Sequence, residues 1–158
     1  MTSLPPSHID GFRQFAEAVA DRARAISLPR FRSELLVSRK DDDSPVTAVD
    51  REVESMIRQR IAAAYPGHGV LGEEHGALAI DAEYVWSVDP IDGTRSFVSG
   101  WPLWGTLLAL LHRGRPVLGL VDMPALGERW IGAEGMGAAL NGAACRSRAC
   151  ARLAEATV

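Results

Sequence analysis

Two aspartates three residues apart, Asp89 and Asp92, form the pattern in this sequence that is best suited to chemistry. They follow Tyr84 to Val88, an apolar stretch whose aromatic and β-branched residues predict a short strand. Carboxylate oxygens suit a hard cation such as Mg²⁺, and a tight turn lets main-chain carbonyls join them. A helical turn could begin at Gly93 and Thr94, where amides would be available to hold an anion such as phosphate. Asp-Pro or Asp-Gly alone is an ordinary turn signal, so the prediction depends on the whole string.

A second acidic pair lies upstream, in Gly72-Glu73-Glu74, directly after a short predicted strand at Val70-Leu71. Paired glutamates on a loop are usually solvated. Because two strands here end in carboxylates, however, Glu73 is expected to converge with the aspartate pair on one cation. We expect Glu74 to support the site from outside or to face solvent. His75 is left out of the ligand set because hard Mg²⁺ prefers oxygen.

The start of a helix is marked by Thr47 and Asp50, which have the spacing of an N-cap and its reciprocal third-position acid. Aspartate here replaces the usual Glu or Gln. The pair predicts a helix from about Val49 to Tyr65. The cap alone would account for Asp50, and a role in the site would be compatible with it.

The rest of the sequence predicts one more long helix and a series of strands. Apolar residues at helical spacing predict a helix from His8 to Ser27. Strands are predicted at 35–38, 104–111, 116–123, 128–133 and 136–140, with a short helix at 95–99. The order of two helices followed by a run of strands predicts an α+β fold, with an antiparallel sheet and helices on one face.

Three motifs in order resemble those of the inositol monophosphatase family, Mg²⁺-dependent phosphatases of small phosphorylated metabolites. The motifs are Ser44-Pro-Val-Thr-Ala-Val-Asp50, Gly72-Glu-Glu74 and Asp89-Pro-Ile-Asp-Gly-Thr94. The continuation at Arg95-Ser-Phe97 and Gly100-Trp-Pro-Leu-Trp-Gly-Thr-Leu107 looks most like the histidinol-phosphatase branch. The resemblance runs from about Phe12 to the end of the chain.

The resemblance implies two Mg²⁺ sites that share one aspartate. The first ion would be held by Glu73, Asp89 and the main-chain carbonyl of Ile91. Asp89 would bridge to a second ion, together with Asp92 and a further aspartate that this sequence does not contain. Two cations about 4 Å apart can stabilise the attacking and leaving oxygens of a phosphoryl transfer together.

The resemblance also implies catalytic and substrate-binding roles. Glu73, Thr94 and Asp50 would align the attacking water, and Asp92, Gly93 and Thr94 would bind the substrate phosphate. Lys40 would lie near the site, whereas the three aspartates at 41–43 are expected to be solvated.

The family fold implied by the resemblance is a layered αβαβα sandwich. Residues 1–158 would form a single domain, the N-terminal helix-plus-antiparallel-sheet half of that sandwich. The C-terminal α/β half, with its metal-binding aspartate, would be absent. We expect the chain to be a fragment of a longer protein, although a genuinely short form is the alternative.

Composition excludes several other classes of protein. The net charge is −3 and no basic block occurs, so nothing indicates nucleic-acid binding. No apolar run approaches the length of a membrane span, and residues 1–12 lack the apolar core of a signal peptide. Two cysteines without metal-motif neighbours, Cys145 and Cys150, are consistent with a reducing cytoplasm. A homodimer is possible because members of the family are commonly dimeric.

The sequence leaves three functions open. The favoured one is a Mg²⁺-dependent phosphatase that hydrolyses histidinol phosphate in histidine biosynthesis. The second is an inositol-1-monophosphatase or a related small-metabolite phosphatase. The third is a non-catalytic form that binds metal or phosphate, because the last metal ligand is missing from the chain.

Overall fold

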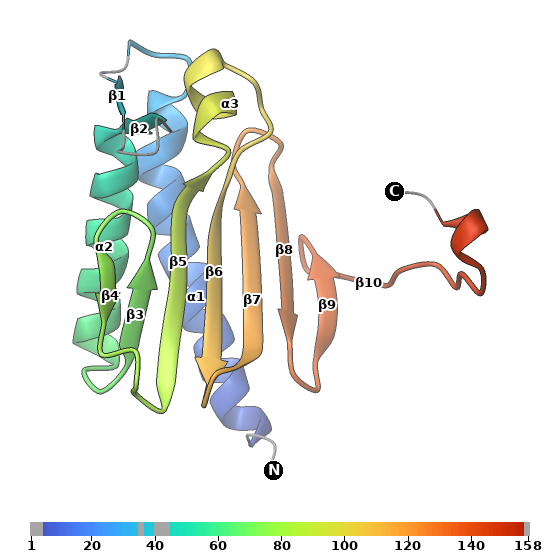
Figure 1. Ribbon diagram of the computed structural model, residues 1–158. Coiled ribbons are helices and arrows are strands. Elements are labelled where there is room, and N and C mark those ends of the chain that lie inside the picture. Colours follow the sequence, from blue (N-terminus) through green and yellow to red (C-terminus); the bar gives the residue numbers. More distant parts are fainter. Residues whose placement is uncertain (1–4, 35–36, 40–44, 157–158) are drawn as a thin grey trace.

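The computed structural model describes residues 5–34, 37–39 and 45–156. Lys40 and the aspartates at 41–43 lie outside the described residues, as does the first part of the strand predicted at 35–38. In this part of the chain, a layer of helices lies on one face of a large sheet (Figure 1). Within this described part, no helix is both long and apolar enough to cross a membrane.

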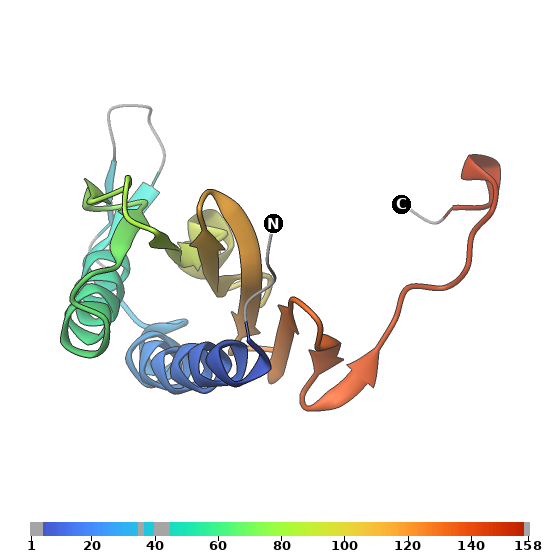
Figure 2. The same cartoon turned by 90° about the horizontal axis from the view of Figure 1, so that it is seen from below.

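Two helices cover one face of the sheet, as the sequence predicts. They are α1 (Pro6–Ser27) and α2 (Ala48–Ala64). Helix α1 begins slightly earlier than predicted because a proline is well tolerated in the first helical turn. The buried side chains of both helices recur every three or four residues: Ile9, Phe12, Ala16, Val19, Ala20 and Ala23 in α1, then Val49, Val53, Ile57 and Ile61 in α2. Seen end-on, the two helices lie side by side against the sheet (Figure 2).

The main sheet has eight strands in the order β10-β9-β8-β7-β6-β5-β3-β4. Their bounds are β3 (Gly69–Gly72), β4 (Gly76–Leu78), β5 (Tyr84–Asp92), β6 (Gly105–His112), β7 (Arg115–Met123), β8 (Glu128–Ala133), β9 (Gly137–Leu140) and β10 (Ala143–Cys145). A small separate sheet pairs β1 (Val37–Arg39) with β2 (Pro45–Thr47). The short α3 (Thr94–Ser99) follows β5, and the 3₁₀ turns η1 (Leu28–Arg30) and η2 (Leu153–Glu155) complete the described elements.

The main sheet is mixed, which corrects the expectation of a purely antiparallel one. Strands β3 and β5 pair in parallel, whereas every other pair of neighbouring strands in this sheet is antiparallel. In sequence, β4 and the loop after it lie between β3 and β5. They carry the chain back along the edge of the sheet, so that β5 starts at the same end as β3. As a consequence, β3 and β5 end at the same edge of the sheet.

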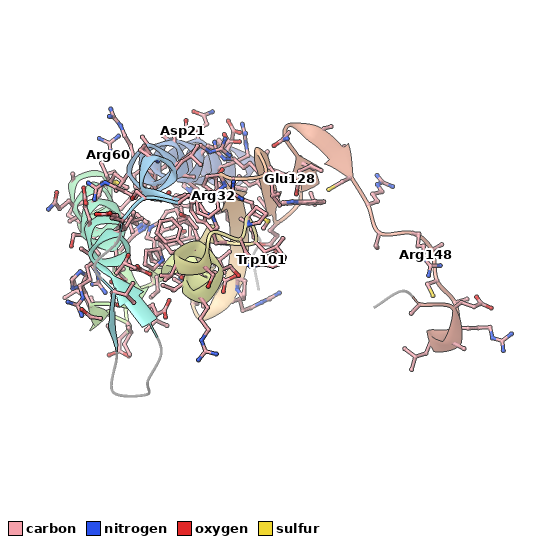
Figure 3. All side chains as sticks on the ribbon, turned by 90° about the horizontal axis from the view of Figure 1, so that it is seen from above. Asp21, Arg32, Arg60, Trp101, Glu128 and Arg148 are labelled. Atoms are coloured by element: carbon pink, nitrogen blue, oxygen red, sulfur yellow. The ribbon has the colours of Figure 1, made fainter. Side chains whose placement is uncertain are left out.

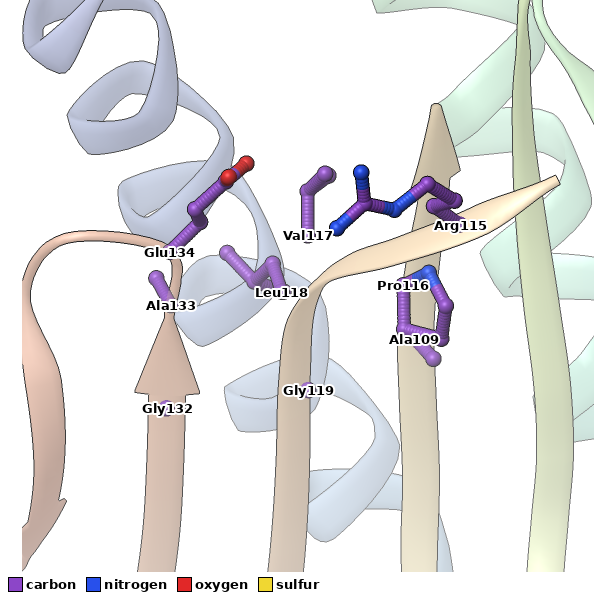
Figure 4. Close-up of a pocket in the computed structure, with 9 residues that line it drawn as sticks. All are labelled: Ala109, Arg115, Pro116, Val117, Leu118, Gly119, Gly132, Ala133 and Glu134. Atoms are coloured by element: carbon purple, nitrogen blue, oxygen red, sulfur yellow. The ribbon is translucent and has the colours of Figure 1, made fainter. Parts of the chain in front are cut away.

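The two faces of the sheet differ in what covers them. Trp86, Leu110 and Leu120 are buried against the helices. On the other face no described helix packs, and the side chains of Leu71 and Trp130 are 49% and 40% exposed. A hollow of ≈ 430 Å³ crosses this open face, lined by Ala109, Arg115, Pro116, Val117, Leu118, Gly119, Gly132, Ala133 and Glu134. Figure 4 shows the hollow with α1 lying behind the strands.

A buried carboxylate anchors α1 to the sheet. The side chain of Asp122 in β7 is fully buried and accepts hydrogen bonds from Arg24 of α1, at 2.7 and 3.0 Å. Arg129 of β8 donates to the same carboxylate at 2.8 Å and also pairs with Asp21 of α1. A buried charge is tolerated only when it is paired and hydrogen-bonded in this way.

Candidate active site

Two acidic strand ends meet at the edge of the sheet because β3 and β5 run in parallel. In the parallel register Gly72 lies opposite Val88, so that Glu73 and Asp89 are the next residues on neighbouring strands. The amide of Glu73 donates a hydrogen bond to the carbonyl of Val88, at 3.2 Å. The Glu73 and Asp89 side chains interact directly through a hydrogen bond. The convergence expected from the sequence is therefore present for this pair.

Among the acidic side chains at this edge of the sheet, Asp89 has the most strongly shifted pKa. Its pKa is raised to about 8, first by burial, then by the hydrogen bond and charge of Glu73, and further by the charges of Asp92 and Asp50. Its Oδ1 atom is buried and has no hydrogen-bond partner among the described residues. We call Asp50, Glu73, Asp89 and Asp92 the acidic cluster. Crowded carboxylates with an unsatisfied buried oxygen are more often found at a functional site than in a structural core.

Asp92 lies at the exposed end of β5 and completes the approach from that strand. The pairing of β5 with β6 is regular up to Asp89 and then shifts its register before Asp92. The strand is also longer than predicted, so Asp89 lies inside it and not in the following turn. A register shift of this kind bends a strand and redirects its side chains, which is common beside active sites.

Thr94 and Asp50 meet above the acidic strand ends. The Thr94 hydroxyl lies 3.0 Å from the carbonyl oxygen of Ile91 and 3.3 Å from Oδ1 of Asp50. Asp50 in turn accepts hydrogen bonds from the amide and hydroxyl of Thr47, at 2.9 and 2.5 Å. The predicted capping box is confirmed. Asp50 accepts from Thr47 through Oδ2 and from Thr94 through Oδ1. Burial raises the pKa of Asp50, although these hydrogen bonds act in the opposite direction.

Gly93 makes the turn between β5 and α3 possible. Its φ angle is +79°, in the left-handed region that favours glycine. A Cβ atom at this position would lie 2.8 Å from the carbonyl oxygen of Leu103. Trp104 packs beside the turn, fully buried, with an indole N–H that has no partner in the described part of the chain. Trp101 lies at the same end of the molecule and is 65% exposed (Figure 3).

The donor chemistry of the cluster suits a hard cation. Its charged groups are all carboxylates, and the Ile91 carbonyl lies at the same turn. Within the described residues, no three His, Cys, Asp or Glu side chains form a ready cage for one ion. An ion here would be held by few protein ligands and would keep several waters, which is the usual arrangement for Mg²⁺.

Sequence reasoning missed one acidic residue near this site, Glu54. It lies on α2, four residues after Asp50, and its side chain is fully buried. Its carboxylate contacts the loop that follows β3. The four-residue spacing from Asp50 places both acids on the same helix face, and this was the available signal.

Comparison with known proteins identifies the family. The model of the inositol monophosphatase family matches residues 8–158, nearly the whole chain. The chain belongs to this family. The family resemblance inferred from the three motifs is confirmed.

Individual relatives agree with the assignment. The chain is 41% identical over 157 residues to the chloroplastic bifunctional phosphatase IMPL2 of Arabidopsis thaliana, covering 98% of this chain and 45% of that protein. It is 48% identical over 124 residues to a histidinol-phosphatase of Mycobacterium tuberculosis, covering 78% and 48% of the two chains. A probable inositol 1-monophosphatase of the same organism is 41% identical over 120 residues, covering 76% and 44%.

The fold comparison leads to the same family. The solved structure of the extragenic suppressor protein suhB from Bartonella henselae superposes with a TM-score of 0.84 at 29% identity, covering 90% of this chain and 57% of that one. The predicted α+β fold of the inositol monophosphatase type is thus confirmed. The chain spans about half the length of the curated relatives it matches.

Proposed function

We propose that this chain carries the metal-binding half of a Mg²⁺-dependent phosphomonoesterase. The supporting observation is the buried Asp89 Oδ1, which has no partner among the described residues and lies in a cluster of carboxylates. Glu73, Asp89 and the Ile91 carbonyl would hold one ion, and Asp89 and Asp92 would contribute to a second. A bound ion would supply a Lewis acid that makes water nucleophilic near neutral pH and neutralises phosphoryl charge.

The remaining residues would position the reactants. Thr94, whose hydroxyl hydrogen is directed at Ile91 and Asp50, would accept a hydrogen bond from the attacking water. The Glu73 carboxylate would take up the proton of that water. The amides of Gly93 and Thr94 would hold the substrate phosphate at the start of α3. Precise placement of this kind accounts for a large part of phosphoryl-transfer catalysis.

Histidinol phosphate is the substrate that we favour, as part of histidine biosynthesis. The higher identity to a histidinol-phosphatase than to a probable inositol 1-monophosphatase supports this choice. The string Arg95-Ser-Phe97 after the acidic motif supports the same branch. Inositol 1-phosphate is the alternative, since phosphatases with both kinds of name match the chain at 40% identity or more.

A second candidate function is binding of a cation or phosphate without turnover. One observation favours it: the chain spans about half the length of the relatives named as phosphatases, and the further metal-binding aspartate that the family resemblance implies does not occur in residues 1–158. A further α/β layer, the second half of the fold, would supply the missing ligand and cover the open face of the sheet. In its absence we expect residues 1–158 to bind Mg²⁺ weakly and to hydrolyse phosphate esters poorly.

Phosphate release in the presence of Mg²⁺ tests the proposal. By the full-length protein we mean residues 1–158 joined to the second half of the fold. We expect it to hydrolyse histidinol phosphate with a higher kcat/KM than inositol 1-phosphate. Asp92→Asn should remove most of this activity without unfolding the protein, because Asp92 lies at an exposed strand end. Asp81→Asn, the same change at an exposed position outside the cluster, is the control. A preference for the inositol ester would contradict the substrate, and full activity of the Asp92 variant would contradict the site.

A further inference from the structure

A buried ion pair on α2 contacts the loop that carries Glu73. The side chain of Glu54 is 0% exposed, and Oε1 accepts a hydrogen bond from Nε of Arg58 at 2.7 Å. Arg58 is also hydrogen-bonded, through Nη2, to the main-chain carbonyl of Gly76. The pair therefore spans from the helix to the hairpin between β3 and β4.

The Glu54 carboxylate also binds the main chain of the loop itself. Its Oε2 atom accepts a hydrogen bond from the amide of Glu74 at 2.6 Å, and Oε1 accepts one from the amide of His75 at 3.1 Å. Hydrogen bonds to an ionised acceptor are among the stronger ones in proteins, particularly where water is excluded. A second contact from α2 reaches the same loop, because Ser55 Oγ lies 3.1 Å from Nε2 of His75.

The loop packs closely on this ion pair, so that any side chain at Gly72 would displace the Glu54 carboxylate and the Arg58 guanidinium. A Cβ atom at Gly72 would lie 2.0 Å from Oε1 of Glu54 and 2.7 Å from Nη2 of Arg58. Contacts that short force one group to move. The glycine of the Gly-Glu-Glu motif thus has a physical explanation in the approach of the main chain to Glu54.

Glu73 lies between two anchors. Its own amide is bound to the carbonyl of Val88 in β5, and the next two amides along the chain are bound to Glu54 in α2. With the main chain fixed on both sides, the Glu73 side chain is directed towards Asp89. Glu54 itself is committed to Arg58 and to the two amides, so it orients an acidic ligand without joining the cluster.

We propose that Glu54 is a positioning residue, which fixes the 73–75 loop so that the Glu73 carboxylate reaches a divalent cation held with Asp89. This inference rests on the proposed function, because it assumes that the acidic cluster binds the cation. Groups that orient a metal ligand from outside commonly change metal affinity by about 10–100-fold when they are replaced.

The test is Glu54→Gln in the full-length protein, with Mg²⁺ binding measured by calorimetry and amide exchange of Glu74 and His75 measured by NMR. Glutamine has the same shape but turns one acceptor into a donor, so one amide loses its partner and the other keeps only a weaker bond to a neutral oxygen. We expect Mg²⁺ binding to weaken by about 10–100-fold and the two amides to exchange about tenfold faster or more. Glu52→Gln is the matched control, since Glu52 is 49% exposed and pairs only loosely with Arg30, at 3.6 Å.

The outcomes separate the inference from the function on which it rests. If the wild type binds Mg²⁺ and Glu54→Gln binds it with the same affinity, the inference alone is overturned. If the wild type does not bind Mg²⁺, the proposed function is overturned as well. A lower unfolding temperature with unchanged Mg²⁺ affinity would show a purely structural role and would also overturn the inference. If Glu54→Gln does not fold, Glu54→Asp replaces it, because it keeps the charge for Arg58 but withdraws the oxygens from the amides.

Discussion

Strand β5 begins among aromatic rings with satisfied partners and ends in a crowded group of acidic side chains. Near its start, Nε1 of Trp86 donates to Nδ1 of His68 at 3.1 Å, and the His68 ring stacks between Tyr65 and Tyr84 at centroid distances of 4.6 and 4.9 Å. We call these four residues the aromatic cluster. At the other end, Asp89 has an unsatisfied buried oxygen and a pKa raised to about 8.

The contrast separates stability from function within one strand. Stacked rings and a satisfied indole N–H contribute to folding without needing a ligand. Crowded acids weaken the folded state and become favourable only when a cation neutralises them. Replacing a residue of the aromatic cluster should therefore cost stability, whereas replacing one of the acidic cluster should cost cation binding and activity.

The largest effect is expected for Asp89→Asn. The variant removes the acid shared by both proposed ions, and a Lewis-acid contribution of several kcal/mol corresponds to a loss of roughly 100-fold or more in kcat/KM. The unfolding temperature in cation-free buffer at pH 7 should be unchanged or higher, because asparagine is neutral without taking up a proton, whereas burial and Glu73 raise the pKa of Asp89 to about 8 in the folded protein. Parallel assays of phosphate release and thermal unfolding check both parts. A variant that is less stable but keeps its activity would contradict the assignment of cation binding and activity to the acidic cluster.

The opposite pattern is expected for Trp86→Phe. This change leaves Nδ1 of His68 without its donor and opens a small cavity in the core, at a cost of about 2 kcal/mol in the free energy of unfolding. Urea denaturation measures that cost, and calorimetry should give the wild-type affinity for Mg²⁺. A weakened cation site in this variant would show that the two ends of β5 are coupled.

The sequence predicted the parts of this contrast that are local. The string from Asp89 to Thr94 and the Thr47–Asp50 cap are complete within a few residues, so their geometry could be anticipated. The parallel pairing of β3 with β5 could not, because β4 is three exposed residues with no pattern. Glu54 was missed because its acceptor role involves amides about 20 residues away in sequence, whereas a glutamate on a polar helix normally faces solvent.

A smaller effect is expected at the helix cap that joins the acidic cluster to α2. Thr47→Ala removes the hydroxyl that caps the helix and binds Asp50, and it should cost about 1 kcal/mol of stability. Thr47→Ser keeps the hydroxyl and serves as the control. Chemical denaturation of both variants sharpens the comparison, since equal losses would mean that the methyl group, and not the hydrogen bonds, stabilises this position.

The smallest effect concerns the pH dependence of the aromatic cluster. Burial lowers the pKa of His68 in the folded protein, so the unfolded chain takes up a proton more readily once the pH falls below about 6.5. This contribution to stability is present above that pH and is lost on acidification through the folded-state pKa. His68→Asn can still accept from Trp86 but does not titrate, so its stability should fall less steeply from pH 7.5 to pH 5. Identical slopes in thermal unfolding would assign the pH dependence to other groups.

The central claim, that the acidic cluster is a divalent cation site, is tested most directly by the effect of Mg²⁺ on the unfolding temperature of the full-length protein. Ligand that binds only the folded state stabilises it in proportion to the logarithm of its concentration above Kd. The account predicts an unfolding temperature that rises with Mg²⁺ in the wild type and does not rise in Asp89→Asn. A wild-type unfolding temperature that does not respond to Mg²⁺, or an equal rise in both proteins, would contradict it.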